Sequence, residues 1–198
     1  MDRRRIIVGI SGASGAVYGV RALETLRALD VETHLVVSKA GALTLEHELG
    51  MKVADVRALA DRHYAIGDVG AACSSGSFRT LGMIVAPCSM KTLAEIATGV
   101  SSTLLTRSAD VVLKERRRLV LLVRETPLTR VHLTNMLAVT DMGGIVAPPV
   151  PAFYTHPASI GDMVDHTVGR VLDLFDLDTS LVKRWSGMRT SGQQEEPE

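Results

Sequence analysis

The sequence predicts a single α/β domain in which a parallel sheet carries helices on both faces. Short apolar runs alternate along the chain with segments of helical periodicity, which is the pattern of such a sheet. The runs, such as Leu119–Val123, do not alternate apolar with polar residues, so we expect strands that are buried on both faces. The length of 198 residues and the apolar share of 46% suit one domain with a substantial core.

The first unit is a strand, a turn and a helix. Ile6–Ile10 is the apolar strand and Ser11–Gly15 is a turn of small residues. A helix follows, because Ala16, Val20 and Leu23 share one helical face. The later strands are expected at Glu32–Ser38, Thr80–Ala86, Leu119–Val123 and Ile145–Ala147, with Pro87 ending the second of these. The later helices are expected at Gly41–Leu49, Val53–Asp61, Ser89–Thr98 and Thr103–Arg117, then from the N-cap Thr129 to Gly143-Gly144, and at Ile160–Phe175.

Two segments read as non-regular structure. Asp68–Phe78 is rich in Gly, Ala and Ser and is expected to be a loop. From Ser186 onward the chain is polar and closes with Glu-Glu-Pro-Glu. We therefore expect residues 1–185 to form the domain and residues 186–198 to form a disordered tail.

Composition argues against several classes of protein. The formal net charge is zero, which argues against a general nucleic-acid binder. The sequence contains no run of about 18 apolar residues, so we expect no membrane span. Cys73 and Cys88 offer no disulfide framework and no apolar leader precedes the first strand, so we expect a soluble cytoplasmic protein. Asp162 and His166 share a helix face, but two ligands do not make a metal site. We expect both to be ordinary polar residues at the surface, with no metal bound.

The turn Ser11–Gly15 predicts a phosphate cradle. It leaves backbone N–H groups unpaired at a helix N-terminus, where the helix dipole also favours an anion. The glycines follow a G-x-x-G-x-x-G spacing, and the second strand ends in Ser38 rather than in an acidic residue. Both features differ from the dinucleotide-binding pattern, so we expect a mononucleotide or another phosphorylated ligand. Tight packing of a helix on a strand is the alternative.

Three unusual segments follow strands, and the carboxyl ends of parallel strands meet at one edge of a sheet. They are Ser11–Gly15, Pro87–Thr92 and Arg124–Pro127. The second offers hydroxyls and Lys91 to a phosphate, or is an ordinary capped helix with Lys91 in solvent. In the third, Arg124 could bind a phosphate and Glu125 could move a proton, or the two could form a structural ion pair. The charge run Lys114–Arg118 is typical of the solvated end of a helix. Lys114 lies one turn before the other basic residues, so its side chain could point in a different direction.

Seven motifs in this order resemble the UbiX-type flavin prenyltransferases. The likeness runs from about Arg4 to Trp185. Related flavin-dependent cysteine decarboxylases carry Pro-Ala-Ser-Ala-Asn-Thr where this chain has Ala-Pro-Cys-Ser-Met-Lys-Thr, which counts against them. The motifs are Ser11–Gly15, Ala72–Phe78, Ala86–Thr92, Ala109–Arg117, Arg124–Pro127, Pro151–Tyr154 and Asp165–Arg170.

The resemblance implies a three-layer α/β/α fold of the Rossmann-like, flavodoxin-like kind and a homododecamer built from trimers. It implies that reduced FMN and dimethylallyl phosphate are the substrates. The five-carbon group would be joined to flavin N5 and C6, closing a fourth ring and releasing phosphate without a metal. The product, prenylated FMN, would pass to a UbiD-type decarboxylase, as in ubiquinone biosynthesis.

The resemblance also implies roles for individual residues. Ser14 and Glu125 would handle protons, and Glu48 and Lys114 complete the expected catalytic group. Trp185 would close the pocket, and the departure at Thr155-His156 leaves the rim of the prenyl site undefined. FMN would be lined by Gly12, Ala13, Ser14, Ser38, Ser89, Met90, Lys91, Thr92 and Arg124. The prenyl phosphate would be held by Tyr154 and Arg170, with Lys114, Arg107 and Glu48 near it.

Two other functions fit the same motifs. One is a flavin-dependent decarboxylase or oxidoreductase on this fold, and the other is a carrier that stores FMN without chemistry. The acidic and basic residues from Lys114 to Arg170 distinguish an enzyme from a carrier, because a carrier needs no second phosphate site.

Overall fold

The computed structural model describes residues 3–185 and 187 and contains a parallel six-stranded sheet. The strand order is β3-β2-β1-β4-β5-β6. No helix among the described residues is long and apolar enough to span a membrane. The strands are β1 (Arg5–Ile10), β2 (Glu32–Val37), β3 (Arg62–Tyr64), β4 (Gly82–Cys88), β5 (Arg118–Val123) and β6 (Ile145–Val146). The helices are α1 (Ala16–Ala28), α2 (Lys39–Leu49), α3 (Val53–Arg57), α4 (Met90–Thr98), α5 (Leu104–Lys114), α6 (Arg130–Asp141) and α7 (Ile160–Asp173), with 3₁₀ turns η1 (Ala72–Ser74) and η2 (Phe153–Thr155).

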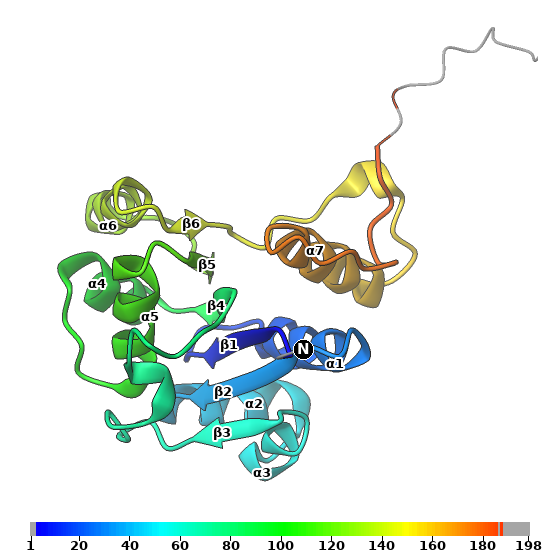
Figure 1. Cartoon of the computed structure of the whole chain (residues 1–198). Helices are drawn as coiled ribbons and strands as arrows, with labels where there is room; N and C mark the ends of the chain where they lie inside the picture. The colour runs from blue at the N-terminus through cyan, green and yellow to red at the C-terminus, as the bar shows by residue number, and fades with distance from the viewer. Residues whose placement is uncertain (1–2, 186, 188–198) are drawn as a thin grey trace, which may run out of the picture.

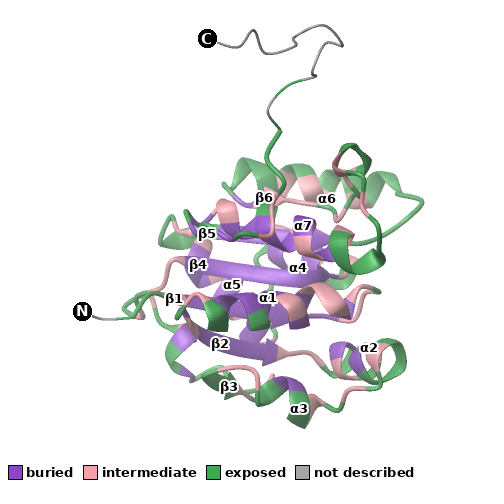
Figure 2. Cartoon of the chain, turned by 90° about the vertical axis from the view of Figure 1, so that its right-hand side faces the viewer, coloured by how far each residue is buried: buried purple, intermediate pink, exposed green. Residues whose placement is uncertain are grey.

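Helices cover both faces of the sheet, which confirms the predicted three-layer α/β fold. The helices α4, α5 and α6 lie on one face, while α1, α2, α3 and α7 lie on the other (Figure 1). Successive side chains of β1 point to opposite faces. Ile6 and Val8 therefore join the core with α1 and α7, whereas Ile7 joins the core with α4 and α5. Apart from the arginines that begin β1 and β5, the central strands β1, β4 and β5 are buried (Figure 2), which is why their sequences are nearly continuous apolar runs.

Several predicted boundaries are confirmed by side-chain caps. Ser89 begins α4 by accepting a hydrogen bond from the N–H of Thr92 at 3.3 Å. Thr129 begins α6 in the same way, with the N–H of His132 at 3.3 Å. These caps depend on residues three apart in the chain, which is why local sequence predicts them.

The edge strand β3 is missing from the sequence prediction, which continues the preceding helix to Asp61. The helix α3 in fact ends at Arg57. The Asp61 carboxylate accepts hydrogen bonds from the backbone N–H (2.9 Å) and the hydroxyl (3.0 Å) of Thr33 on β2. Two of the three residues of β3 are exposed, so no apolar run marks this strand in the sequence.

Two other element ends also differ from the prediction. β4 continues through Pro87 to Cys88 instead of ending at Ala86. Proline lacks only the N–H, and the carbonyl of Pro87 accepts a hydrogen bond from the N–H of Ser11 at 3.2 Å. α5 ends at Lys114 rather than Arg117, because Arg116 takes a left-handed conformation with φ of 56°. The guanidinium of Arg117 then turns back to the carbonyls of Gly76 and Phe78.

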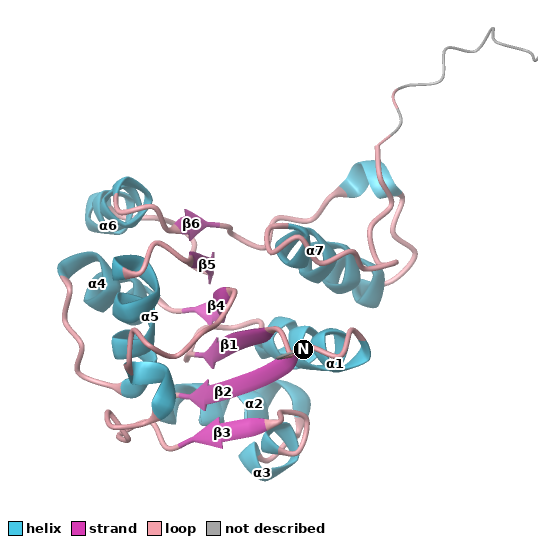
Figure 3. Cartoon of the chain, viewed as in Figure 1, coloured by secondary structure: helices cyan, strands magenta, loops and turns pink. Residues whose placement is uncertain are grey.

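The strand order places a topological switch point at β1. β2 lies on one side of β1 and β4 on the other, so the connections leave in opposite directions and open a crevice at the carboxyl ends. A loop that contains η2 joins β6 to α7, which packs beside α1 (Figure 3). The crevice is thus bordered by α1, α7 and the loops after β1, β4 and β5.

Gly19 lets α1 approach the sheet closely, and we predict that Gly19→Ala destabilises the fold. A Cβ at this position would lie 2.3 Å from the carbonyl oxygen of Ala86 on β4. Because backbone must move to relieve this overlap, the free energy of unfolding should fall by about 1–3 kcal/mol. Chemical denaturation at fixed protein concentration measures the change.

Gly161→Ala is the matched control for this test. A Cβ on Gly161 would meet only the Ser159 hydroxyl at 3.4 Å, so its effect should be neutral or stabilising by up to about 1 kcal/mol. Equal stability of the Gly19→Ala variant and the native protein would contradict the close approach of α1.

Candidate active site at the carboxyl edge of the sheet

The structure brings the loops after β1, β4 and β5 together, as their sequence positions predict. The Ser11 hydroxyl donates to the carbonyl of Pro87 at 2.9 Å and accepts from the N–H of Ser89 at 2.8 Å. The N–H of Arg124 donates to the carbonyl of Cys88 at 3.1 Å. Backbone and a buried serine therefore fix the three loops relative to one another. The polar side chains that follow them share one edge of the sheet.

The loop from Gly12 to Ser14 packs against the start of α2. A Cβ on Gly12 would lie 2.3 Å from the Cβ of Ala40, so no other residue fits this approach. Ser38 caps α2 by accepting a hydrogen bond from the N–H of Gly41 at 2.9 Å. The glycine turn and the N-terminus of α2 thus lie side by side, and with them the predicted FMN-lining residues Gly12 and Ser38.

Glu48 occupies the N-terminus of α1. Gly15 precedes this helix with φ of 102° and gives it no side-chain cap. Instead, the Glu48 carboxylate accepts hydrogen bonds from the N–H groups of Gly15 (2.9 Å) and Ala16 (3.0 Å). The sequence predicts unpaired N–H groups at this helix N-terminus, but those of Gly15 and Ala16 are paired with Glu48. A carboxylate from α2 supplies the anion that the helix end favours.

The surroundings of Glu48 keep its carboxylate ionised. Burial alone would raise the pKa of Glu48, but hydrogen bonds from Ser14, Ala16 and Gly15 and the positive charge of Arg124 outweigh it. Together they hold the pKa of Glu48 below its ordinary value. Ser14, Glu48 and Arg124 are thus electrostatically coupled at one point of the crevice.

These three residues line one cavity of about 390 Å³. Its other lining residues are mainly apolar, and Val17, Leu49, Ile160 and Val164 also line a neighbouring cavity of about 520 Å³. A site with an ionised and hydroxylic end and an apolar wall suits a phosphorylated molecule that also carries apolar atoms.

At the start of α4, the predicted flavin-lining residues adopt an ordinary capped helix. The Ser89 hydroxyl donates to the hydroxyl of Thr92 at 3.1 Å. Lys91 is largely exposed and pairs with Glu95 at 2.7 Å, while Met90 is half-buried. In the single chain Lys91 therefore matches the alternative in which it lies in solvent. Thr92 is buried, and its hydroxyl and that of Ser89 bond to each other at the start of α4.

Glu125 lies in the loop between β5 and α6 and is exposed. Its carboxylate accepts a hydrogen bond from the N–H of Thr126 at 3.0 Å. Within the described residues it forms no ion pair with Arg124, so the structural ion pair considered from the sequence is absent there. Among the described residues, the Glu125 carboxylate has no ion-pair partner.

A second cluster lies at η2 and the end of the described chain. The ring of Tyr154 packs edge-on against Trp185, with ring centres 5.6 Å apart, and against His166 at 5.8 Å. Tyr154 and Trp185 line a cavity of about 380 Å³ with His156 and Lys183. None of Ser14, Glu48 and Arg124 lines this cavity, so the two clusters are separate in one chain.

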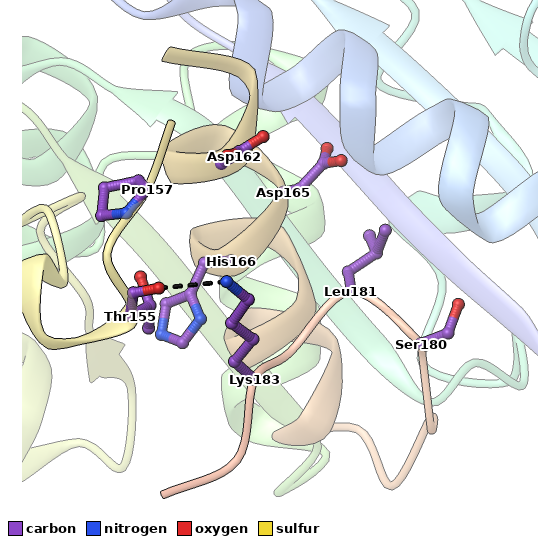
Figure 4. Close-up of a pocket in the computed structure, with 8 residues that line it drawn as sticks. All are labelled: Thr155, Pro157, Asp162, Asp165, His166, Ser180, Leu181 and Lys183. Atoms are coloured by element: carbon purple, nitrogen blue, oxygen red, sulfur yellow. Dashed lines mark hydrogen bonds between the residues drawn. The ribbon is translucent and has the colours of Figure 1, made fainter. Parts of the chain in front are cut away.

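His166 is buried, which corrects its expected place on the surface. Only 8% of the residue is exposed, and it lines a cavity of about 320 Å³ with Thr155, Asp165 and Lys183 (Figure 4). Lys183 donates to the carbonyl of Thr155 at 3.2 Å and so ties the end of the described chain to η2. The sequence could have indicated the position of His166, because His166 and Arg170 are four residues apart and therefore share a face of α7.

Each predicted cation of the prenyl site pairs with a carboxylate, and none of them lines the cavity of Ser14, Glu48 and Arg124. Arg170 pairs with Asp173 at 2.7 Å, and Arg107 pairs with Asp110 on α5. Lys114 pairs with Glu115 at the end of α5, just before β5 begins. It therefore lies at the amino edge of the sheet, whereas Arg124 follows β5 at the carboxyl edge. A strand of this length spans about 20 Å.

Glu48→Gln tests the cap on α1. We expect the variant to be less stable by about 0.5–1 kcal/mol near neutral pH, because the amide loses the charge that faces the helix N-terminus. The folded pKa of Glu48 lies below its ordinary 4.5. The native advantage should therefore be full above that value and be lost as pH falls through the folded pKa. Denaturation at several pH values measures it.

Glu46→Gln, an exposed change on the same helix, is the control. A stability difference for Glu48→Gln that stays constant from neutral to acid pH would contradict the role of the charge.

Comparison with known proteins assigns the chain to a family. Residues 1–172 match the family model described as Flavoprotein. Flavin prenyltransferase UbiX of Neisseria meningitidis serogroup B is 58% identical over 185 residues, which cover 93% of this chain and 98% of that protein.

Solved structures agree with this assignment. The crystal structure of AnUbiX (PadA1) in complex with FMN and dimethylallyl pyrophosphate is 56% identical with a TM-score of 0.93, and the match covers 94% of this chain and all of that chain. The dodecameric FMN-dependent UbiX-like decarboxylase from Escherichia coli O157:H7 is 53% identical with a TM-score of 0.90, over 92% of this chain and all of that chain. The chain therefore belongs to the UbiX family of flavin prenyltransferases.

Proposed function

We propose that this protein joins the dimethylallyl group of dimethylallyl phosphate to N5 and C6 of reduced FMN and releases phosphate. The observation that carries the proposal is the cavity where Ser14, Glu48 and Arg124 meet an apolar wall at the switch point. A relative at 56% identity binds FMN and dimethylallyl pyrophosphate, which supports both substrates. The chemistry that such a site supplies is anion binding at one end and exclusion of water at the other.

The residues at the crevice suit FMN. The close approach of Gly12 to Ala40 sets the glycine turn against the N-terminus of α2. The hydroxyls of Ser38, Ser89 and Thr92 and the Arg124 guanidinium suit a phosphate or the polar edge of a ring. Bound FMN supplies the nucleophilic N5 and C6 atoms. We assign its binding to Gly12, Ala13, Ser14, Ser38, Ser89, Met90, Lys91, Thr92 and Arg124.

The chemistry that we assign to the protein is charge stabilisation and proton transfer. The C–O bond of the allylic phosphate breaks more readily when fixed cations and a phenol stabilise the leaving phosphate. Tyr154, Arg170 and Lys114 supply those groups, with Arg107 and Glu48 near them and Trp185 closing the site. Ser14 and Glu125 handle protons, including the one that C6 loses when its new bond to carbon forms.

The separation of these groups in one chain leads us to propose that the site is completed by neighbouring copies. Lys114 lies at the amino edge of its own sheet, and Tyr154 lines a different cavity from Arg124. Large apolar side chains are exposed on α6, among them Val131, Leu133 and Leu137, and a relative at 53% identity is dodecameric. A homododecamer built from trimers would bury such faces and bring the edges together.

We further propose a cytoplasmic enzyme whose single domain spans residues 1–185 and whose product is delivered to a UbiD-type decarboxylase. Both cysteines are buried and unpaired, as suits a reducing compartment. The matched family model covers residues 1–172. The predicted tail, 186–198, lies outside the described residues except for Gly187.

An anaerobic incubation tests the proposed function. Reduced FMN and dimethylallyl phosphate are mixed with the protein, and we expect mass spectrometry to detect flavin heavier by one prenyl unit. A parallel incubation with dimethylallyl pyrophosphate compares the two donors. Unchanged FMN mass with both donors would exclude prenyl transfer and leave a carrier, or a decarboxylase or oxidoreductase of the same fold.

Glu125→Gln tests the proposed proton transfer. The amide keeps the shape of the side chain but cannot take a proton, so we expect FMN to bind normally while the fourth ring closes at least about 100-fold more slowly. The measurement is the rate of appearance of the cyclised product, with FMN affinity measured in parallel.

Glu24→Gln is the matched control, because Glu24 is an exposed glutamate that pairs with Arg21 on α1. Turnover of Glu125→Gln at the rate of this control would show that Glu125 has no part in the reaction.

A further inference from the structure

The imidazole of His166 is the most buried titratable group beside the second cluster, and the reaction proposed above does not use it. It is 8% exposed, and its Nδ1 has no hydrogen-bond partner among the described residues. Its Nε2 lies 3.4 Å from the phenol oxygen of Tyr154, with the two rings nearly perpendicular at 87°. Within the part of the chain that the structure describes, the only hydrogen-bond partner of the imidazole is thus the hydroxyl of a residue that we assign to the donor phosphate.

The charged groups around His166 are already engaged. Asp165 holds Arg21 at 2.6 Å, and Asp162 accepts hydrogen bonds from the N–H of Ala158 and the hydroxyl of Ser159, both at 2.8 Å. Lys183 is bound to the Thr155 carbonyl. Because these charged groups bind other partners, the Tyr154 phenol is the group with which the imidazole forms its hydrogen bond.

The burial of Nδ1 favours one tautomer. With the proton on Nδ1, a buried N–H would lack an acceptor, which is rare in folded proteins. With the proton on Nε2, the buried atom without a partner is the unprotonated Nδ1, which is an acceptor. Nε2–H then donates to the phenol oxygen. The phenol hydrogen of Tyr154 is then available to a ligand. In this arrangement Nε2–H donates a hydrogen bond to the phenol oxygen, and the phenol O–H can donate a second one to a phosphate oxygen.

α7 places His166 next to the other residue assigned to the donor phosphate. Arg170 follows one helical turn later, and the two side chains line a shared cavity with Ala152. Tyr154 stands on a three-residue 3₁₀ turn and is half exposed, so the turn alone leaves its ring free to rotate. Among the described residues, the ring of Tyr154 makes edge-on contacts with the rings of His166 and Trp185.

We propose that His166 is a positioning residue for the prenyl donor: its Nε2–H holds the Tyr154 phenol so that the phenol hydrogen faces the donor phosphate. This role rests on the proposed function, because it presupposes that Tyr154 binds that phosphate. His166 itself touches neither substrate. Its removal should weaken donor binding through Tyr154 and leave FMN binding unchanged.

A double-mutant cycle tests the proposal in the full-length assembled protein. His166→Phe keeps an aromatic ring and removes the hydrogen bond, so we expect the KM for dimethylallyl phosphate to rise about tenfold. FMN affinity should change less than twofold. In a Tyr154→Phe background His166→Phe should have no further effect, because the hydroxyl on which it acts is gone.

His166→Gln provides the rescue, because the glutamine Nε2–H can replace that of histidine and does not depend on the aromatic ring. We expect it to keep the KM within about threefold of the native value. Equal losses in the Gln and Phe variants, or losses of His166→Phe and Tyr154→Phe that simply add, would assign His166 a purely structural role and overturn the proposal.

Trp185, the single tryptophan of the chain, gives a readout that does not need turnover. Its ring contacts Tyr154, so its fluorescence during titration with dimethylallyl phosphate reports donor binding. About tenfold weaker binding in His166→Phe would support the positioning role even if the native protein failed to prenylate FMN. Prenylation with unchanged donor affinity in the variant would keep the proposed function and refute the role of His166. Absence of donor binding by the native protein would refute both.

Discussion

The burial of the parallel sheet on both faces is the constraint on which the rest of the structure depends. A strand with helices above and below it has no room for an unpaired charge, because taking a charge out of water is unfavourable by several kcal/mol. Ionised and hydroxylic side chains therefore gather where strands end. Ser14, Ser38, Ser89 and Arg124 all follow the carboxyl ends of strands, and a buried serine hydroxyl on Ser11 locks two of these loops together.

The same constraint separates the groups that the reaction needs. Lys114 precedes β5 and Arg124 follows it, so a full strand length lies between them within one chain. Tyr154 stands on the segment between β6 and α7, beside a different cavity from that of Arg124. A site that needs all of them has to be built between copies, and the exposed apolar residues of α6 provide surface for that contact. On the proposed assignment of these residues, assembly is part of catalysis and not only of stability.

The sequence predicts what depends on near neighbours in the chain. The apolar strands β1, β4 and β5 and the caps at Ser89 and Thr129 follow from local patterns, and so does the convergence of three loops. The edge strand β3 is missing from the sequence prediction because it is short and polar. The positions of Tyr154 and Trp185 on one cluster agree with their implied place in one site, while the roles of the site residues remain predictions.

Features set by tertiary contacts could not be predicted. Glu48 caps a helix more than thirty residues away in the sequence, and nothing around either segment signals the pairing. His166 is buried because η2 and the end of the described chain fold over α7. The amino-edge position of Lys114, by contrast, follows from the alternation of strands and helices alone, since α5 must end where β5 begins.

A crystal structure of the assembled protein with bound FMN tests the central claim most directly. The account predicts that the flavin lies at the carboxyl edge beside Ser14 and Arg124, with Lys114 and Tyr154 of neighbouring copies reaching the same cavity. A flavin bound elsewhere, or an assembly in which Lys114, Tyr154 and Arg170 of every copy lie far from the flavin ring, would contradict it.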